Sequence, residues 1–251
     1  MDKFKKTARV IGIVVLAVVI VCEVVLLARF LYLQNKQNAE KKQLNAYLAQ
    51  IKELETMKDK EGVSSLSGVN GDFVAWIKCA DIGLSLPIVQ ARADAADFYL
   101  SHDFKKNQSI YGCPYVKSDC DLAESLTGGN SAIVGHSAFL GGVAIFSGFY
   151  DYLAPKQSFN FKINMQLLNG VAEYEIVSAF EVDGDDEDGL FIYNTTEFNG
   201  DNFAQFQSII STKNQTGRTG HIAHSDTVLT IMTCSKHDLS KKVLVVAKKV
   251  N

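Results

Sequence analysis

The chain has 251 residues, of which 47% are hydrophobic and 21% are charged, with a net charge of −3 at pH 7. This length is enough for one or two domains with a buried core, and the composition excludes a disordered chain, a collagen-like chain and a small disulfide scaffold. The near-neutral charge gives no reason to expect nucleic acid as a partner. Residues 1–36, with six Lys/Arg and two carboxylates, carry +4, whereas residues 70–251, with 14 bases and 21 acids, carry −7.

The N-terminal segment is predicted to anchor the chain in a membrane. Residues 10–28 are apolar except for Glu23, and with residues 30–33 they are long enough to cross a hydrocarbon core of about 30 Å. The bases that precede this stretch predict a cytoplasmic N-terminus and an extracytoplasmic body. A cleaved signal peptide is the alternative, but its apolar region is shorter and ends in small residues rather than in Arg29 and bulky side chains.

We therefore expect a cytoplasmic basic segment over residues 1–9 and one membrane-spanning helix over 10–33, which places the protein in the cell membrane. Residues 34–69 are predicted to form a helical stalk or linker. Its apolar residues recur at steps of three and four, and such a stripe more often packs on the chain's own domain than on a partner. The members of this stripe are Leu44, Tyr47, Leu48, Ile51, Leu54 and Met57.

Residues 70–251 are predicted to form one mostly β domain. The short apolar runs 131–134, 227–233 and 243–247 are typical of buried strands, and residues 172–182 alternate between apolar and charged positions. One helix is expected from Asp201 to about Ser211, with its apolar residues on one side. A β-barrel or sandwich with an inserted helix fits this pattern best.

Two polar side chains at the ends of predicted strands are the strongest catalytic candidates. Cys234 ends the apolar run that begins at residue 228, and His136 follows the run 131–134 after a glycine. Nucleophilic catalysis by cysteine needs a thiolate, and a neighbouring imidazole is a common way to stabilise one. A cysteine or histidine at a strand end is more often structural, so the pair needs independent support.

That support comes from the order of segments, because residues 70–248 resemble a class B sortase, a membrane-anchored cysteine transpeptidase. The matching segments are 70–78 (NGDFVAWIK), 86–90 (LPIVQ), 97–100 (DFYL), 103–104 (DF), 130–136 (NSAIVGH), Phe146, the helix at 201–211 and 230–234 (TIMTC). The resemblance implies a closed, sortase-like β-barrel with an inserted helix and N-terminal helices, preceded by one transmembrane helix.

The resemblance also implies a mechanism and its partners. Cys234 is expected to attack a backbone carbonyl in the C-terminal sorting signal of a secreted protein, with His136 as general acid–base. The resulting thioester is expected to pass to an amine of a peptidoglycan precursor. Neither a metal nor an organic cofactor is expected.

The sequence departs from the family pattern near the cysteine. The family has an arginine on the next strand, and the matching position here is Lys242, which keeps the charge but lacks the planar fork. Arg218 is the only arginine in the C-terminal half and is the alternative. Met232 stands where a serine is common. We expect Lys242 to take part in catalysis, and Met232, Thr233 and Arg218 to contact the sorting peptide.

Other interpretations stay open from the sequence. The departures allow a sortase-like peptide-binding protein with weak or lost catalysis, and the Cys–His pair allows a membrane-anchored cysteine protease. Cys113 and Cys120 are close enough in sequence to form a disulfide. The acidic run 181–188 is more simply a solvated turn than a calcium site, since its spacing does not match an EF-hand loop.

Overall fold

The computed structural model describes residues 2–120, 122, 129–137, 139–140 and 143–250. The chain divides into two compact units, Met1–Ala46 and Tyr47–Asn251. Helix α1 (Asp2–Glu61) forms the first unit and continues into the second.

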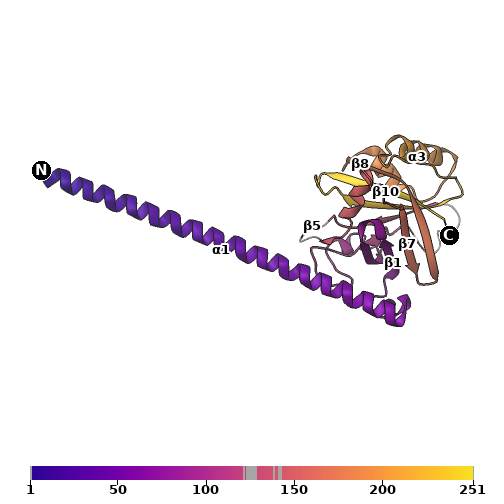
Figure 1. The fold of residues 1–251 in the computed structure, drawn as a ribbon, viewed down its shortest axis with the longest axis horizontal. Coiled ribbons are helices and arrows are strands. Elements are labelled where there is room, and N and C mark those ends of the chain that lie inside the picture. The colour runs from indigo at the N-terminus through magenta and orange to yellow at the C-terminus, as the bar shows by residue number, and fades with distance from the viewer. Residues whose placement is uncertain (1, 121, 123–128, 138, 141–142, 251) are drawn as a thin grey trace. The chain divides into compact units, whose positions relative to one another are not determined.

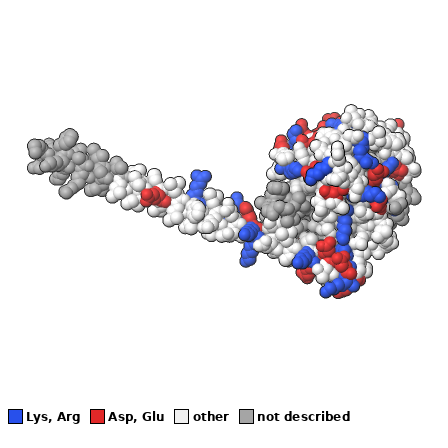
Figure 2. Space-filling view, viewed as in Figure 1, with Lys and Arg blue, Asp and Glu red and all other residues white. Residues whose placement is uncertain are grey.

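The first unit is helical and contains a candidate membrane span. The helix from Val18 onward is long and apolar enough to cross a membrane, with a mean hydropathy of 1.8 in its most apolar window. The large apolar side chains from Leu16 to Leu33 are 46–68% exposed, and the described part of this helix is mostly uncharged in Figure 2. An apolar surface of this extent is typical of a segment in contact with lipid.

The second unit is built around a closed barrel of eight strands, which confirms the predicted fold class (Figure 1). The strands run in the order β1-β2-β3-β4-β9-β10-β8-β7. The pairs β2–β3 and β4–β9 are parallel, and the other neighbouring pairs are antiparallel. The barrel strands are β1 (Phe73–Cys79), β2 (Leu84–Gln90), β3 (Tyr115–Val116), β4 (Gly129–Val134), β7 (Lys162–Leu167), β8 (Gly170–Asp183), β9 (Thr227–Cys234) and β10 (Lys241–Lys249).

Short helices and one small sheet complete the unit. Strands β5 (Phe139–Leu140) and β6 (Val143–Ala144) pair with each other. The connections include four 3-10 helices: η1 (Val63–Gly68), η2 (Ala80–Ile82), η3 (Phe98–Leu100) and η4 (Ser147–Leu153). Two α-helices, α2 (Glu187–Asn194) and α3 (Gly200–Thr212), lie between β8 and β9 in the chain. On the face shown in Figure 2, charges of both signs are interspersed over the barrel.

Hydrophobic burial explains why the predicted elements form where they do. The alternating residues of β8 that were predicted to share a face are all buried, and so is the apolar side of α3 around Phe206, Ile209 and Ile210. The stripe on α1 also packs on its own domain, because Tyr47 is 6% and Leu54 1% exposed. This packing makes the end of α1 part of the barrel unit.

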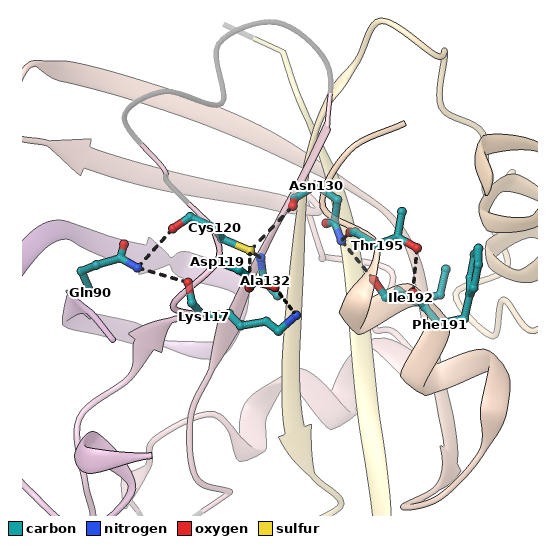
Figure 3. A network of polar contacts seen from close by, with 9 residues as sticks. All are labelled: Gln90, Lys117, Asp119, Cys120, Asn130, Ala132, Phe191, Ile192 and Thr195. Atoms are coloured by element: carbon teal, nitrogen blue, oxygen red, sulfur yellow. Dashed lines mark hydrogen bonds and ion pairs between the residues drawn. The ribbon is translucent and has the colours of Figure 1, made fainter. Parts of the chain in front are cut away.

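One buried asparagine ties α2 to the two strands that lead to the candidate site, and Figure 3 shows its contacts with Ile192 and Thr195. Asn130 on β4 donates to the carbonyls of Ile192 (3.1 Å) and Thr195 (2.8 Å), and its Oδ1 accepts from Thr230 Oγ1 on β9 (2.8 Å). The amide is 3% exposed and all these bonds are internal. It therefore fixes α2, β4 and β9 relative to one another.

The disulfide that the spacing of Cys113 and Cys120 allowed is not formed, because both are free thiols. Cys113 Sγ lies 3.9 Å from the Pro87 carbonyl, whereas Cys120 Sγ accepts from the Ala132 amide at 3.4 Å (Figure 3). Burial raises the pKa of both thiols above its ordinary value, which keeps them in the unreactive neutral form.

Candidate active site

Cys234 and His136 come to the same end of the barrel because their strands are parallel neighbours. Val134 on β4 is paired with Met232 on β9, and each candidate lies two residues beyond its member of that pair. The ladder continues past the strand, since the Gly135 amide donates to the Met232 carbonyl at 3.3 Å. The topology thus brings together two residues that are far apart in the chain.

Lys242 is the cation beside the cysteine sulfur. It faces Cys234 directly in the antiparallel register of β9 and β10, and its Nζ donates to Cys234 Sγ at 3.1 Å. The adjacent Lys241 instead lies 3.8 Å from Glu181. Among the described residues no carboxylate lies within ion-pair distance of Lys242. An ammonium at this distance can stabilise negative charge that develops at the sulfur or at an oxygen beside it during a reaction.

A backbone carbonyl holds the imidazole of His136. Its Nε2 lies 2.8 Å from the carbonyl oxygen of Leu100. A carbonyl oxygen only accepts, so Nε2 must carry the proton, which leaves Nδ1 as the ring nitrogen that can exchange one. The orientation of the ring is therefore set by the segment that contains η3.

Gly112 is required by this arrangement and was not identified from the sequence. Its φ is +62°, and a Cβ there would lie 2.4 Å from the Tyr99 carbonyl and 3.3 Å from His136 Cδ2. A side chain at this position would displace either the backbone carbonyls or the imidazole. A glycine between Tyr111 and Cys113 carries no recognisable signal in a single sequence.

Aromatic packing supports the backbone at Gly135 and His136. The Phe146 amide donates to the His136 carbonyl at 3.0 Å. A Cβ on Gly135 would lie 2.6 Å from the Phe146 ring, which is fully buried. The resemblance indicated an aromatic residue at this position, and the structure places it directly behind the strand end that carries the histidine.

The loop after Cys234 is attached to η4. The Ser235 amide donates to the Lys241 carbonyl at 2.9 Å, and Lys236 forms an ion pair with Asp151. The rings of His237 and Tyr150 meet edge to face, with centroids 4.8 Å apart. These contacts were not anticipated, because the ion pair and the ring contact join residues that are far apart in the sequence.

The two predicted peptide contacts on β9 differ in accessibility. Met232 is partly exposed and shares a strand face with Cys234, because side chains alternate along a strand. Thr233 points to the opposite face and is 3% exposed. Its hydroxyl is buried without a hydrogen-bond partner. The predicted contact of Thr233 with the sorting peptide stays a prediction, and in this structure its side chain is not exposed to make it.

Arg218 lies away from Cys234 and Lys242, and its predicted contact with the sorting peptide stays a prediction. Its guanidinium pairs with Glu175 and lies 4.5 Å from the centre of the Phe161 ring. Glu175 faces Lys248 in the register of β8 and β10. Lys248 is six residues along β10 from Lys242, a separation of about 20 Å at about 3.3 Å per residue.

No metal site is evident in the described part of the chain, where no group of three or more His, Cys, Asp or Glu side chains is arranged to bind an ion. The acidic run has a structural role instead. Asp186 caps α2 by accepting from the Gly189 amide at 2.8 Å, and both Asp186 and Asp188 lie 3.1 Å from Lys213. The last residues of the predicted solvated turn thus begin a helix.

Comparisons with known proteins were made on sequence and on structure. No family model matches the sequence. Sortase B of Staphylococcus aureus is 26% identical over 226 residues, which cover 86% of each chain. Sortase B of Listeria monocytogenes is 24% identical over 200 residues, which cover 76% of this chain and 74% of the relative.

Solved sortase B structures share the fold. A Staphylococcus aureus sortase B–substrate complex has a TM-score of 0.68 at 23% identity, covering 84% of this chain and 98% of that one. A sortase B complexed with triglycine has a TM-score of 0.66 at 22% identity, covering 84% and 99%. A cysteine-to-serine mutant of Clostridium perfringens sortase B has a TM-score of 0.65 at 23% identity, covering 77% and 89%.

Proposed function

Because these relatives and the shared fold support a class B sortase, and with it a cysteine transpeptidase, we propose that Cys234 cleaves a C-terminal sorting signal of secreted proteins through a thioester. The acyl group is then transferred to an amine of a peptidoglycan precursor. The observation that carries the proposal is the 3.1 Å contact between Lys242 Nζ and Cys234 Sγ. It lies at the end of the barrel where the neighbouring strand β4 leads to His136. The substrate and the triglycine held by solved relatives agree with an acyl donor and an amine acceptor.

The acylation half of the reaction uses all three side chains. The Cys234 thiolate attacks the scissile carbonyl carbon and forms a tetrahedral intermediate whose oxygen carries the negative charge. The intermediate collapses when the C–N bond breaks, and the leaving amine takes a proton from Nδ1 of protonated His136. Lys242 stabilises the thiolate before attack and then faces the developing oxyanion.

The second half reverses these proton movements. An amine attacks the thioester carbon and loses a proton to Nδ1 of the now neutral His136. The C–S bond breaks, the new amide leaves, and the thiolate of Cys234 returns to its contact with Lys242. The proton on Nε2 stays there in both halves, donated to the Leu100 carbonyl, so Nδ1 alone performs both transfers.

Lysine in place of arginine changes how the charge is delivered. Its ammonium is a compact point charge on a flexible stem, whereas a guanidinium offers two parallel donors to a planar oxygen pair. Lys242 is thus suited to follow the charge from sulfur to oxygen, but it holds a peptide carbonyl less rigidly. Together with Met232 on the same strand face, this difference favours a sorting-signal preference altered from the family's usual one.

The membrane arrangement belongs to the same proposal. The candidate span in α1 and the basic residues before it support a cytoplasmic segment over 1–9 and a single span over 10–33. The stalk over 34–69 then leads to an extracytoplasmic catalytic domain over 70–251. Protease added to intact cells would degrade the barrel and leave residues 1–9 protected; the reverse pattern contradicts this orientation.

A trapping experiment tests the proposed chemistry. The full chain in detergent is incubated with a library of peptides taken from the C-terminal ends of secreted proteins, and intact-mass spectra are recorded with and without triglycine. We expect an acyl adduct that is absent in Cys234→Ala and an amide product that needs the amine. Acid product alone, unchanged by triglycine, would indicate a protease, and bound peptide without any adduct would indicate a non-catalytic peptide-binding protein.

A further inference from the structure

Residues 98–113 form a folded loop whose two sides are joined along their length. The Cys113 amide donates to the Tyr99 carbonyl at 2.9 Å, and the Ser109 amide donates to the Ser101 carbonyl at 2.8 Å. At the far end the Asp103 amide donates to the Asn107 carbonyl at 2.8 Å, and Asp103 Oδ1 accepts from the Asn107 amide at 2.9 Å. We call this segment the 98–113 loop. Its cross-links allow a displacement at one end to reach the other.

One end of the 98–113 loop lies along one edge of the His136 imidazole. The Leu100 carbonyl accepts from Nε2, and a Cβ on Gly112 would come within 3.3 Å of the adjacent ring atom Cδ2. Both halves of the loop therefore meet the same edge of the ring. A shift of the loop by a few tenths of an ångström would change either the hydrogen bond from Nε2 or the packing of Gly112 beside the imidazole.

The last turns of α1 contact the loop at both ends. Gln50 Nε2 donates to Asp103 Oδ2 at 3.0 Å at the far end, and the ring of Tyr47 lies 5.1 Å from that of Tyr111, next to Gly112. A hydrogen bond to a carboxylate is stronger than one between neutral groups. One buried hydrophobic cluster joins the helix and the loop, and it includes Leu54, Tyr99, Phe104 and Cys113.

We propose that the end of α1, from Tyr47 onward, positions His136 through the 98–113 loop, and that Gln50 is a positioning residue for the acid–base step. The consequence for that step depends on the proposed function of His136. The helix that contains the candidate membrane span would then belong to the catalytic machinery as well as to the anchor. A catalytic domain that begins at residue 70 would lack this support.

Three substitutions at Gln50 distinguish the effect of its hydrogen bond to Asp103 from other effects of changing this side chain. Ala, Glu and Lys are all good helix formers, so they leave α1 intact. Gln50→Ala removes the donor to Asp103, Gln50→Glu places a second carboxylate against it, and Gln50→Lys restores a donor. Glu55→Ala is the matched control: Glu55 lies on the same helix, but it accepts from Ser85 Oγ at 2.7 Å and does not contact the loop.

Two readouts are recorded on the full chain in detergent micelles. Ring 15N shifts of His136, assigned by His136→Gln, report the Nε2–H tautomer, and steady-state transfer reports kcat and KM. For Gln50→Ala we expect a mixed tautomer signal and kcat lower by about three- to tenfold with little change in KM. We expect a larger effect for Gln50→Glu, and wild-type values for Gln50→Lys and Glu55→Ala.

The readouts distinguish failure of the positioning role from failure of the proposed function. The positioning role is overturned if Gln50→Ala and Gln50→Glu keep the wild-type ring signature, or if Gln50→Lys does not restore it. If the ring signature changes as expected while kcat does not, the positioning role is supported and His136 is not the acid–base. A lower melting temperature with an unchanged ring signature counts as a structural effect and against the proposal.

Discussion

The substitution of Lys242 by methionine removes the ammonium that lies 3.1 Å from Cys234 Sγ and keeps an unbranched side chain on β10. Two unit charges at this distance attract each other by about 5 kcal/mol at an effective dielectric constant of about 20, and by about 1.3 kcal/mol at about 80. Both side chains are partly exposed. Solvent screening therefore moves the value toward the lower limit, to about 2 kcal/mol.

This free energy sets how much more slowly Cys234 reacts when the ammonium is removed. A loss of about 2 kcal/mol corresponds to about a 30-fold slower reaction of Cys234 at a fixed neutral pH. Lys242→Arg restores the cation and should recover most of the rate, and its two-pronged guanidinium should also bind a peptide carbonyl at least as well. Cys234 is thus predicted to react much faster with lysine or arginine at position 242 than with methionine there.

Alkylation by iodoacetamide measures this order directly. The Cys22→Ser background removes the exposed thiol in the apolar helix, and the other three cysteines are buried. Mass spectrometry then gives the alkylation rate constant of Cys234, and the same variants are assayed for peptide transfer. Equal rate constants for the wild type and Lys242→Met, in a protein with an unchanged melting temperature, would refute the assignment of Lys242 as the partner of the thiolate.

Further substitutions test the surroundings of the site. Gly112→Ala should destabilise the fold by about 3 kcal/mol or more, because the strain of a positive φ adds to a 2.4 Å contact with the Tyr99 carbonyl. Urea unfolding should show a smaller cost, about 1 kcal/mol, for Gly83→Ala, whose φ of +64° is similar but whose surroundings are open. Asn130→Ala removes the hydrogen-bond partner of two buried carbonyls and one hydroxyl. The free energy of unfolding should fall by about 2–4 kcal/mol in the same assay. A decrease below about 1 kcal/mol contradicts the role of Asn130 in joining α2 to the barrel. Arg218→Ala should leave transfer unchanged, because the ion pair that it removes is exposed and lies about 20 Å along β10 from Lys242. A loss of transfer activity would show that Arg218 takes part in the reaction.

The sequence by itself predicted the elements whose burial is regular. The apolar runs at β4, β9 and β10 and the alternation along β8 were recognised because a strand buries either both faces or every second residue. Helix α3 was recognised from its apolar side, within one residue at each end. Strand β3, with two residues, and helix α2, with eight, were missed because segments this short contain too little periodicity.

The chemistry of the site was predicted only in part. Cys234, His136 and Lys242 stand at strand ends that are visible in the sequence, and the resemblance to class B sortases indicated their order along the chain. The pairing of the strands then decided which basic residue lies beside Cys234, which spacing in the sequence could not. Register places Lys242 opposite Cys234, whereas Glu175 of β8, the ion-pair partner of Arg218, lies opposite Lys248 near the far end of β10.

Only the tertiary structure decided how the histidine is held. The Leu100 carbonyl, Gly112 and Gln50 carry no mark of function in one sequence, because a carbonyl, a glycine and a helical glutamine are common everywhere. Their roles arise from close approaches between segments that are distant in the chain. Burial patterns are local and periodic and can be recognised in a sequence, whereas the position of one imidazole depends on contacts that exist only after the barrel has closed.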